Sequence, residues 1–326
     1  MHSFSFAGKV AAHAAQIEAW GFDGMLLADS QNLNADVWVE LGLAATATDR
    51  IGLGPGVTNP ATRHPAVTAS AIATLQVESA GRALLAFGRG DSALSQIGRE
   101  PVHVAELERA LVEIQGFLRG EEVELANGAT SRIGWIADSG QPKVPVAVAA
   151  TGPHVIAAGA RHAEQLDFTV GTEAERLRWA VQTARAAGAD GLSLGAFVNV
   201  GVHPDPGVAR DLVRGSTAIL ARFATEGAPP DGLSDVTRKG IVELAADFDE
   251  ARHGQAAAPH ARRLSDDFID RFAVVGPSDE VAARLAALGE LGIERLIVVP
   301  GSLDADPAAV EEANARFADE VLPALR

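Results

Sequence analysis

The chain has 326 residues, 47% of them apolar and 21% charged, and a net charge of −16. This composition is typical of a globular protein with a large core, and the negative charge argues against an electrostatic nucleic-acid surface and against binding to anionic membranes. The absence of cysteine excludes disulfides, thiolate catalysis and Cys-ligated metals. No apolar run is long enough to span a bilayer and no secretory signal is apparent, so we expect a soluble cytoplasmic protein.

Short apolar runs alternate with segments of helical spacing in the first half of the sequence. A polar, glycine-bearing stretch over 120–143 interrupts the alternation. Apolar spacing and the positions of Gly and Pro predict where the elements end. The expected strands are 25–27, 51–54 and 83–87, with a candidate first strand at 3–6, and the expected helices are 9–20, 35–48, 66–78 and 104–118.

The second half continues this alternation, with one long interruption. Residues 204–272 contain helical stretches and polar linkers, which predict a helical insertion. The expected strands are 144–149, 166–170, 192–200 and 296–299, and the expected helices are 151–162, 173–187, 278–291 and 307–322, of which 278–291 is predicted to be capped.

Alternating strands and helices indicate a parallel sheet with helices on its outside. Seven strands and a candidate eighth, in a chain longer than the roughly 250 residues typical of the fold, favour an α/β (β/α)8 TIM barrel with insertions. A doubly wound open sheet is the alternative. We expect a single domain over residues 1–326, because no interdomain linker or tandem repeat is apparent.

The active site of a (β/α)8 barrel lies at the carboxyl ends of its strands. The residues that follow the predicted strands form a glycine-rich rim with few polar groups, which suits a planar cofactor held by backbone contacts. Motifs of zinc proteases, nucleophile-elbow hydrolases and P-loop kinases are absent from the sequence. The rim comprises Asp29 and Ser30, Gly56 and Val57, Gly88 to Asp91, Ala150 to Gly152, Gly171 and Thr172, Asn199, and Pro300 to Ser302.

The stretch 51–60, Ile-Gly-Leu-Gly-Pro-Gly-Val-Thr-Asn-Pro, has three glycines at the end of a predicted strand. Glycine lets a ligand approach the main chain closely, so this stretch predicts a bulge against a flat ring. An ordinary Gly/Pro loop before the helix at Pro65 is the alternative. The spacing does not match the dinucleotide-binding G-x-G-x-x-G motif.

Other rim residues also have two interpretations. Gly88 to Asp91 is either a cofactor loop or a plain strand-to-helix turn, and Thr151 either caps a helix or lies beside a bound phosphate. Asp29 is either a functional carboxylate or a loop acid. His253 and His260 lie in a polar linker, and we interpret both as solvated rather than as a metal pair.

Two blocks, Gly54-Pro-Gly-Val-Thr-Asn-Pro60 and Arg63-His64-Pro65, together resemble the luciferase-like superfamily of flavin and deazaflavin oxidoreductases. Within it the chain is most similar to the deazaflavin-dependent methylenetetrahydromethanopterin reductase group. The similarity extends from about Trp20 through nearly the whole chain and implies a barrel of the bacterial-luciferase type. The blocks that continue it are Thr68-Ala-Ser-Ala-Ile-Ala-Thr-Leu75, Gly81-Arg82, Gly88-x-Gly-Asp91 and Phe272-x-Val-Val-Gly276.

The resemblance implies a cofactor and a set of residues around it. The cofactor is the deazaflavin coenzyme F420, with FMN as the alternative, and a non-prolyl cis peptide at Gly56–Val57 backs its ring. The implied catalytic residues are Asp29, Ser30 and Asp91. The implied cofactor-binding residues are Gly56, Val57, Thr58, Gly88, Gly90, Asp91, Ala149, Ala150, Thr151, Gly152, Gly171 and Thr172.

The sequence departs from the family pattern in two places. Many relatives have Asp-His after the second strand, where this chain has Asp29-Ser30, and a hydroxyl cannot replace imidazole as a proton donor near neutral pH. Relatives also have a full first strand, sometimes with an acid at the barrel top, whereas residues 2–6 are few and contain no acid. The identity of the proton donor therefore stays open.

The leading hypothesis is a deazaflavin-dependent oxidoreductase that transfers hydride to or from a small organic substrate. A reduced-FMN monooxygenase and a flavin-binding barrel without activity are the alternatives. We expect a homodimer, because helices 35–48 and 66–78 have few charges and leave apolar surface to cover. The cations near the rim, Arg63, His64, Arg89 and Arg99, are expected to hold the anionic tail of the deazaflavin or to be solvated loop charges.

Overall fold

The structure is a computed structural model that describes residues 1–224 and 233–326. Part of the predicted helical insertion, residues 225–232, lies outside the described residues. Contacts within the chain define two compact units. The N-terminal unit comprises His2–Ala149 and Ala157–Leu166, and the C-terminal unit comprises Met1, Ala150–Ile156 and Asp167–Arg326.

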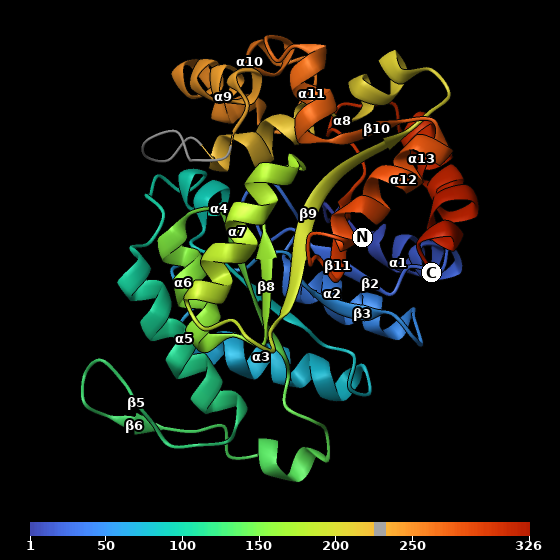
Figure 1. Cartoon of the computed structure of the whole chain (residues 1–326). Coiled ribbons are helices and arrows are strands. Elements are labelled where there is room, and N and C mark those ends of the chain that lie inside the picture. The colour runs from blue at the N-terminus through green and yellow to red at the C-terminus, as the bar shows by residue number, and fades with distance from the viewer. Residues whose placement is uncertain (225–232) are drawn as a thin grey trace. The chain divides into compact units, whose positions relative to one another are not determined.

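The N-terminal unit contains parallel strands that follow one another in chain order, and a separate antiparallel hairpin of β5 (Val123–Glu124) and β6 (Thr130–Ser131) (Figure 1). β1 pairs with β2 and β2 with β3, single bridges join the β3 segment to the β4 segment, and β4 pairs with β7. Together they form an open half-barrel. The bounds are β1 His2–Ser3, β2 Gly24–Leu27, β3 Gly52–Pro55, β4 Leu85–Phe87 and β7 Val146–Ala150, the last residue of which belongs to the C-terminal unit.

Helices follow the strands of this unit, and two of them begin at side-chain caps. Asp36 accepts hydrogen bonds from Trp38 N and Val39 N at the start of α2, and His64 Nδ1 accepts from Ala66 N at the start of α3. The helices are α1 Val10–Ala19, α2 Val37–Thr46, α3 Pro65–Glu78, α4 Asp91–Ser95, α5 Val104–Leu118 and α6 Pro153–His162, the last of which begins in the C-terminal unit.

The guanidinium of Arg82 joins α2 to the following strand. It donates to the carbonyls of Ala45, Thr48 and Ile51 and to the Thr48 hydroxyl. These groups lie at the carboxyl end of α2 and at the entry to β3, where backbone acceptors would otherwise lack partners. Arg82 therefore fixes the start of β3, and with it the register of the loop that follows that strand.

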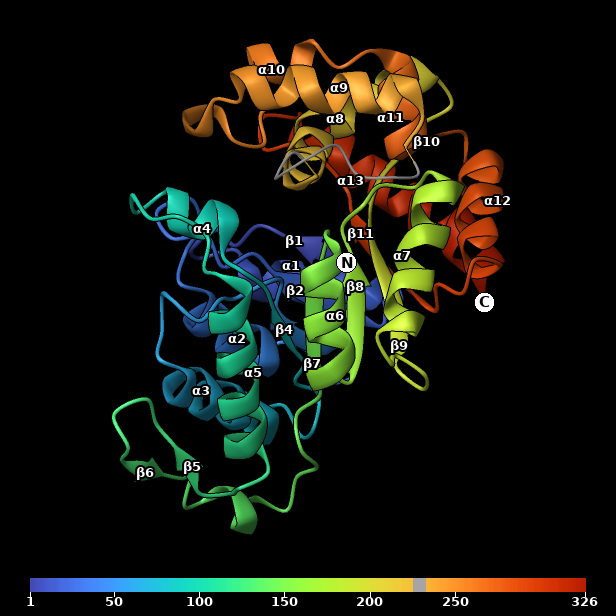
Figure 2. The same ribbon diagram turned by 60° about the vertical axis from the view of Figure 1, so that its left-hand side comes forward.

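The C-terminal unit is organised around the ten-residue strand β9, Ser193–Val202 (Figure 2). β11 pairs with residues 195–199 and β10 with residues 200–202, both in parallel. An ion pair of 2.6 Å between Asp167 Oδ1 and Arg295 Nη2 joins β8 to β11. The other strands of the unit are β8 Gln165–Phe168, which begins in the N-terminal unit, β10 Val274–Gly276 and β11 Arg295–Val299.

The described part of the predicted insertion is helical, as expected, and its helices lie together in Figure 2. These helices are α8 Pro206–Phe223, α9 Asp235–Asp247, α10 Pro259–Arg262 and α11 Asp266–Phe272. The unit also contains α7 Ala174–Ala186, α12 Ser278–Gly289 and α13 Pro307–Arg316, followed by a π-helical turn at Phe317–Val321. No helix among the described residues is both long and apolar enough to cross a membrane.

The structure corrects several expectations. The first strand is His2–Ser3 rather than 3–6, because after Ser3 O accepts from Ala28 N the chain turns away and Phe6 is exposed. Residues 120–143 contain a hairpin, β5 Val123–Glu124 and β6 Thr130–Ser131, and a 3-10 helix at Ile136–Ser139. Two short elements, β10 and α4, were not predicted.

The two histidines of the insertion are buried rather than solvated. His253 is 5% exposed and His260 is 1% exposed. The Phe248 ring lies 4.3 Å from the His260 ring and 6.0 Å from the His253 ring, and His260 Nδ1 accepts from Asp249 N. Both rings are therefore part of the core of the insertion, where burial lowers the pKa of His260.

Candidate functional site

Three loops of the N-terminal unit leave the carboxyl ends of the neighbouring parallel strands β2, β3 and β4. Since these strand ends lie at one edge of the half-barrel, the loops lie side by side. They contain Asp29 and Ser30, Gly56 to Asn59, and Gly88 to Asp91. The predicted rim residues of this unit are thus brought together.

The middle loop is held by backbone hydrogen bonds on both sides. Gly56 N donates to Leu27 O at 2.6 Å, Thr58 N donates to Ala86 O at 3.0 Å, and Gly88 N donates to Thr58 O at 2.9 Å. The Gly56–Val57 peptide is cis, which confirms the prediction from the resemblance. The ends of three strands are therefore linked through residues 56–58.

Glycine is required at two positions because the backbone and side chains of neighbouring strands approach closely. A Cβ on Gly56 would lie 2.7 Å from Leu26 Cβ, and one on Gly88 would lie 2.9 Å from Val57 Cγ2. Neither distance is compatible with van der Waals contact. The glycines thus allow Val57 to lie against the backbone of the β4 loop. Close packing therefore explains the glycines of this region, whether or not a cofactor also requires them.

Asp29 is a buried carboxylate, only 6% exposed. Burial raises the pKa of Asp29, and the Thr58 hydroxyl, the Arg63 charge and a 2.7 Å hydrogen bond from Gln31 Nε2 partly offset this rise. A carboxyl group with a raised pKa can hold or release a proton at higher pH than an ordinary aspartate. Neighbouring Ser30 begins a turn, because its carbonyl accepts from Leu33 N and Asn34 N.

Asn59 and Gly90 connect the β3 loop to the β4 loop. Asn59 is fully buried, and its Oδ1 accepts from Ala61 N and Thr62 N at 3.0 Å each. Gly90 has a φ of +83° and precedes α4, where Asp91 is the first residue. A Cβ on Gly90 would lie 2.8 Å from both Cβ and Cγ of Asn59. The Asn59 amide therefore lies directly against the backbone at the start of α4.

The segments that follow β2, β3 and β4 contain buried polar atoms without a hydrogen-bond partner among the described residues. Such atoms are uncommon in folded proteins, and a bound ligand is one standard explanation for them. Among them are Gln31 Oε1 after β2, Asn59 Nδ2 after β3 and Ser92 Oγ at the start of α4. Unpaired polar atoms after three adjacent strands fit a polar ligand at this edge.

The cations expected near the rim have protein partners. Arg63 forms a 2.8 Å ion pair with Asp36, Arg99 Nη1 donates to Ala61 O at 3.1 Å, and Arg89 Nε donates to Val102 O at 2.7 Å. His64 caps α3 through Nδ1. These bonds give each cation a structural role, and a role in cofactor binding stays a prediction.

In the C-terminal unit, the segment that follows β7 forms a second cluster. Thr151 Oγ1 and Thr169 Oγ1 are 2.6 Å apart, and Thr169 N donates to Ala150 O at 3.0 Å. The buried Arg176 donates from Nη2 to Thr151 O at 3.1 Å, and its guanidinium carbon lies 3.6 Å from the centroid of the Trp179 ring. A buried positive charge therefore lies behind the Ala150–Gly152 segment, which leads into α6.

Gly171 and Thr172 serve the packing of this unit. Gly171 has a φ of +79°, and a Cβ there would lie 2.7 Å from a ring carbon of Phe272. The Thr172 hydroxyl donates to Arg271 O at 2.9 Å. The two residues therefore hold the end of α11, and their predicted contact with a cofactor stays untested.

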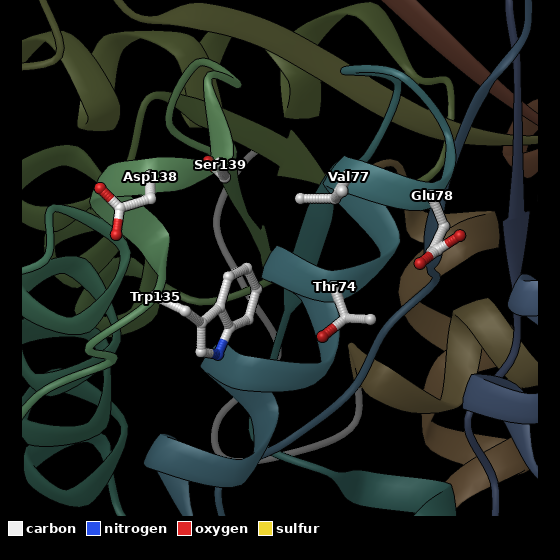
Figure 3. A pocket seen from close by; sticks show the side chains of 6 residues that line it. All are labelled: Thr74, Val77, Glu78, Trp135, Asp138 and Ser139. Carbon is white, nitrogen blue, oxygen red and sulfur yellow. The ribbon is translucent and has the colours of Figure 1, made fainter.

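A pocket of about 420 Å³ lies elsewhere on the N-terminal unit, between the end of α3 and the 3-10 helix (Figure 3). Because α3 returns the chain toward the start of β4, its carboxyl end lies at the edge opposite the three loops. This pocket is open to solvent and is lined by Thr74, Val77, Glu78, Trp135, Asp138 and Ser139. It is not part of the candidate cofactor site.

Sequence reasoning did not single out Gln31, Asn59 or Arg176 as site residues. Gln31 and Asn59 follow strands β2 and β3 by a few residues, so extending the strand-end rule along each loop would have found them. Arg176 lies within a helix, and its contact with Thr151 follows only from the folded structure.

The family model of luciferase-like monooxygenases matches residues 6–295. The chain therefore belongs to the luciferase-like monooxygenase family, which confirms the resemblance carried by the two sequence blocks. It also confirms the prediction of an enzyme of the luciferase-like class.

The chain is similar to several individual members of this family. The chain is 29% identical over 305 residues to 5,10-methylenetetrahydromethanopterin reductase of Methanolobus tindarius, with 89% of each chain covered. It is 30% identical over 302 residues to the F420-dependent glucose-6-phosphate dehydrogenase of Beutenbergia cavernae, covering 88% of this chain and 82% of that one. Among solved structures, the coenzyme F420 dependent tetrahydromethanopterin reductase from Methanopyrus kandleri matches with a TM-score of 0.76 at 23% identity, covering 100% of this chain and 98% of that chain. The chain shares this parallel α/β fold.

Proposed function

We propose that the chain is a coenzyme F420-dependent oxidoreductase that transfers hydride to or from a small organic substrate. In this proposal the chain is a single (β/α)8 barrel domain, and the cofactor ring binds at the loop cluster after β2, β3 and β4. The observation that carries the proposal is the presence of unpaired buried polar atoms in the segments after β2, β3 and β4, of which the β3 segment contains the Gly56–Val57 peptide. The relatives of the chain include F420-dependent enzymes.

The residues present fit a deazaflavin. Val57, Gly88 and Gly90 would lie against the ring, at the edge where the β3 and β4 loops pack closely against each other. Gln31, Asn59 and Ser92 would offer their unpaired polar atoms to the ring and its side chain. The segment Ala149 to Gly152, with the Arg176 charge behind it, would receive the phosphate at the start of α6. When bound, the deazaflavin supplies hydride transfer at C5 of its ring.

Asp29 is the group of this chain best suited to move a proton. It is buried, and burial raises the pKa of its carboxyl, which therefore holds a proton up to a higher pH than an exposed aspartate does. The Gln31 amide holds Oδ1 in place. In this assignment Asp29, rather than Ser30, takes over the proton-donor role of the imidazole that many relatives have.

A reduced-FMN monooxygenase is the second candidate, and the description of the matching family favours it. The same loop cluster would then hold the isoalloxazine ring, and the Ala149–Gly152 segment would hold the single FMN phosphate. The two candidates differ in the cofactor tail, since only coenzyme F420 continues beyond its phosphate into a lactyl and oligoglutamate chain.

The titration of purified protein with coenzyme F420 and with FMN tests the proposal. We expect coenzyme F420 to bind more tightly than FMN by fluorescence quenching. We also expect its Kd to rise with ionic strength, because the anionic tail is attracted by local cations. Tighter binding of FMN would reject the proposal in favour of the monooxygenase.

We also propose that the chain forms a homodimer through α2 and α3. Four large apolar side chains on these helices are exposed, and exposed apolar patches mark interaction surfaces. They are Val39, Leu43, Val67 and Val77.

A further inference from the structure

His2 lies in a strand of only two residues, yet its imidazole contacts the loop that follows β3. β1 pairs with β2 through His2↔Leu26 and Ser3↔Leu27, and Ala28 N donates to Ser3 O at 2.9 Å. This register brings the ring to Gly56, whose carbonyl oxygen is 2.6 Å from His2 Nε2. Because a carbonyl only accepts, Nε2 carries the proton and His2 donates.

The Gly56 carbonyl belongs to the peptide that precedes Val57, so His2 acts on the backbone proposed to contact the cofactor ring. Gly56 N is already held by Leu27 O, and Thr58 N by Ala86 O. The hydrogen bond from His2 adds a third restraint, on the carbonyl between them. A Cβ on Gly56 would lie 3.1 Å from His2 Cδ2, so the imidazole also fills the space behind this peptide.

We propose that His2 is a positioning residue, whose Nε2–H holds the Gly56 carbonyl and thereby fixes the surface that Val57 presents to the cofactor. The effect of His2 on cofactor binding rests on the proposed function, whereas the hydrogen bond between His2 and Gly56 does not. The minimal first strand then has a defined purpose: it supplies a neutral donor to the backbone of the neighbouring loop.

Burial is the main reason why the donor is neutral. Burial lowers the pKa of His2 to about 4, the hydrogen bond to Gly56 opposes this change, and the positive N-terminus adjacent in the chain adds to it. The Phe4 ring lies edge-on to the imidazole, 6.1 Å between centroids. His2 therefore keeps one proton, on Nε2, throughout the neutral pH range.

Nitrogen-detected NMR of the protein without cofactor tests the hydrogen bond. We expect the Nε2–H tautomer with no titration above about pH 5. An Nδ1–H tautomer, or titration near the ordinary histidine value of roughly 6.5, would overturn the inference whatever cofactor the protein uses.

Variants of His2 test the effect on the cofactor. His2→Phe keeps a ring but leaves the buried carbonyl without its donor, so we expect the Kd for coenzyme F420 to rise about tenfold, with a shift in the absorption band of the bound ring. His2→Gln retains an N–H donor and should bind within about threefold of the original chain. The matched control is His13→Phe. This variant removes the 3.0 Å hydrogen bond between His13 Nε2, on α1, and Ser3 Oγ, next to His2 on β1, and leaves the hydrogen bond to Gly56 unchanged.

Loss of affinity in His2→Phe with recovery in His2→Gln supports the positioning role. Equal losses in His2→Phe and His13→Phe, or an unchanged Kd and spectrum in His2→Phe, would overturn it. If the unsubstituted protein binds neither coenzyme F420 nor FMN, the proposed function and the cofactor part of this inference both fall, whereas the NMR result still decides whether His2 holds the loop.

Discussion

Replacement of Gly90 by alanine should destabilise the protein more than the same replacement at Gly98. Both glycines have a positive φ, +83° and +71°, so alanine has a similar backbone penalty at each position. They differ in their surroundings: a Cβ on Gly90 would lie 2.8 Å from Asn59, whereas a Cβ on Gly98 would have nothing within 4 Å. The pair separates the contact with Asn59 from the effect of backbone conformation.

The expected magnitudes follow from these distances. The left-handed conformation costs an alanine about 1–2 kcal/mol, which is the whole effect expected for Gly98→Ala. At Gly90, the buried Asn59 must also move, which weakens the hydrogen bonds from Ala61 N and Thr62 N to its Oδ1. At about 0.5–1.5 kcal/mol for each bond, Gly90→Ala should lower the free energy of unfolding by about 1–3 kcal/mol more than Gly98→Ala.

Urea unfolding followed by circular dichroism measures both variants against the unsubstituted chain. The reasoning also requires that Gly90→Ala weakens cofactor binding, because Asn59 presents its unpaired Nδ2 at the same edge, and that Gly98→Ala leaves it unchanged. Equal changes in the free energy of unfolding for the two variants would refute the proposed contact between Asn59 and the start of α4.

Three further predictions concern the proton, the phosphate and the dimer. Because the folded-state pKa of Asp29 lies above its unfolded value, its ionised form destabilises the fold at neutral pH. Asp29→Asn should therefore raise the free energy of unfolding at pH 7, and this gain should shrink as the pH falls toward about 3.9. The same substitution should lower kcat about 100-fold or more. A lower stability at pH 7 or an unchanged kcat would contradict this assignment. Thr151→Val removes the hydroxyl pair with Thr169 and should weaken coenzyme F420 binding about tenfold by fluorescence titration, and no change in Kd would exclude Thr151 from the phosphate site. Leu43 on α2 is 46% exposed in the single chain and should be buried in the dimer. Light scattering should therefore show the Leu43→Lys variant as a monomer and the control variant Val242→Lys, on α9, as a dimer. A monomeric unsubstituted chain would rule out the dimer.

The alternation of elements could be predicted from the sequence because long elements have clear apolar periodicity. The helix over Val104–Leu118 has the predicted bounds, and most other predicted elements differ from the structure by a few residues at their ends. β10 and α4 have three and five residues, too few for periodicity to distinguish them from a loop. The buried His253 and His260 were misjudged because polar neighbours in sequence conceal the packing of Phe248 on their rings.

The candidate site was predictable where it depends on position along a strand and unpredictable where it depends on contacts across strands. Asp29 and Gly88 were found because each follows a strand, and the cis peptide at Gly56–Val57 came from the family resemblance. The hydrogen bond from His2 to Gly56 spans 54 positions in sequence and depends on the register of β1 against β2. No spacing rule within one sequence gives such a register.

The most direct test of the central claim is a crystal structure of the protein with coenzyme F420. The account predicts that the ring lies against the Gly56–Val57 peptide, with Asp29 beside it and its phosphate at Ala149 to Gly152. Electron density for the ring at any other place, such as the pocket beside Trp135, would contradict the account.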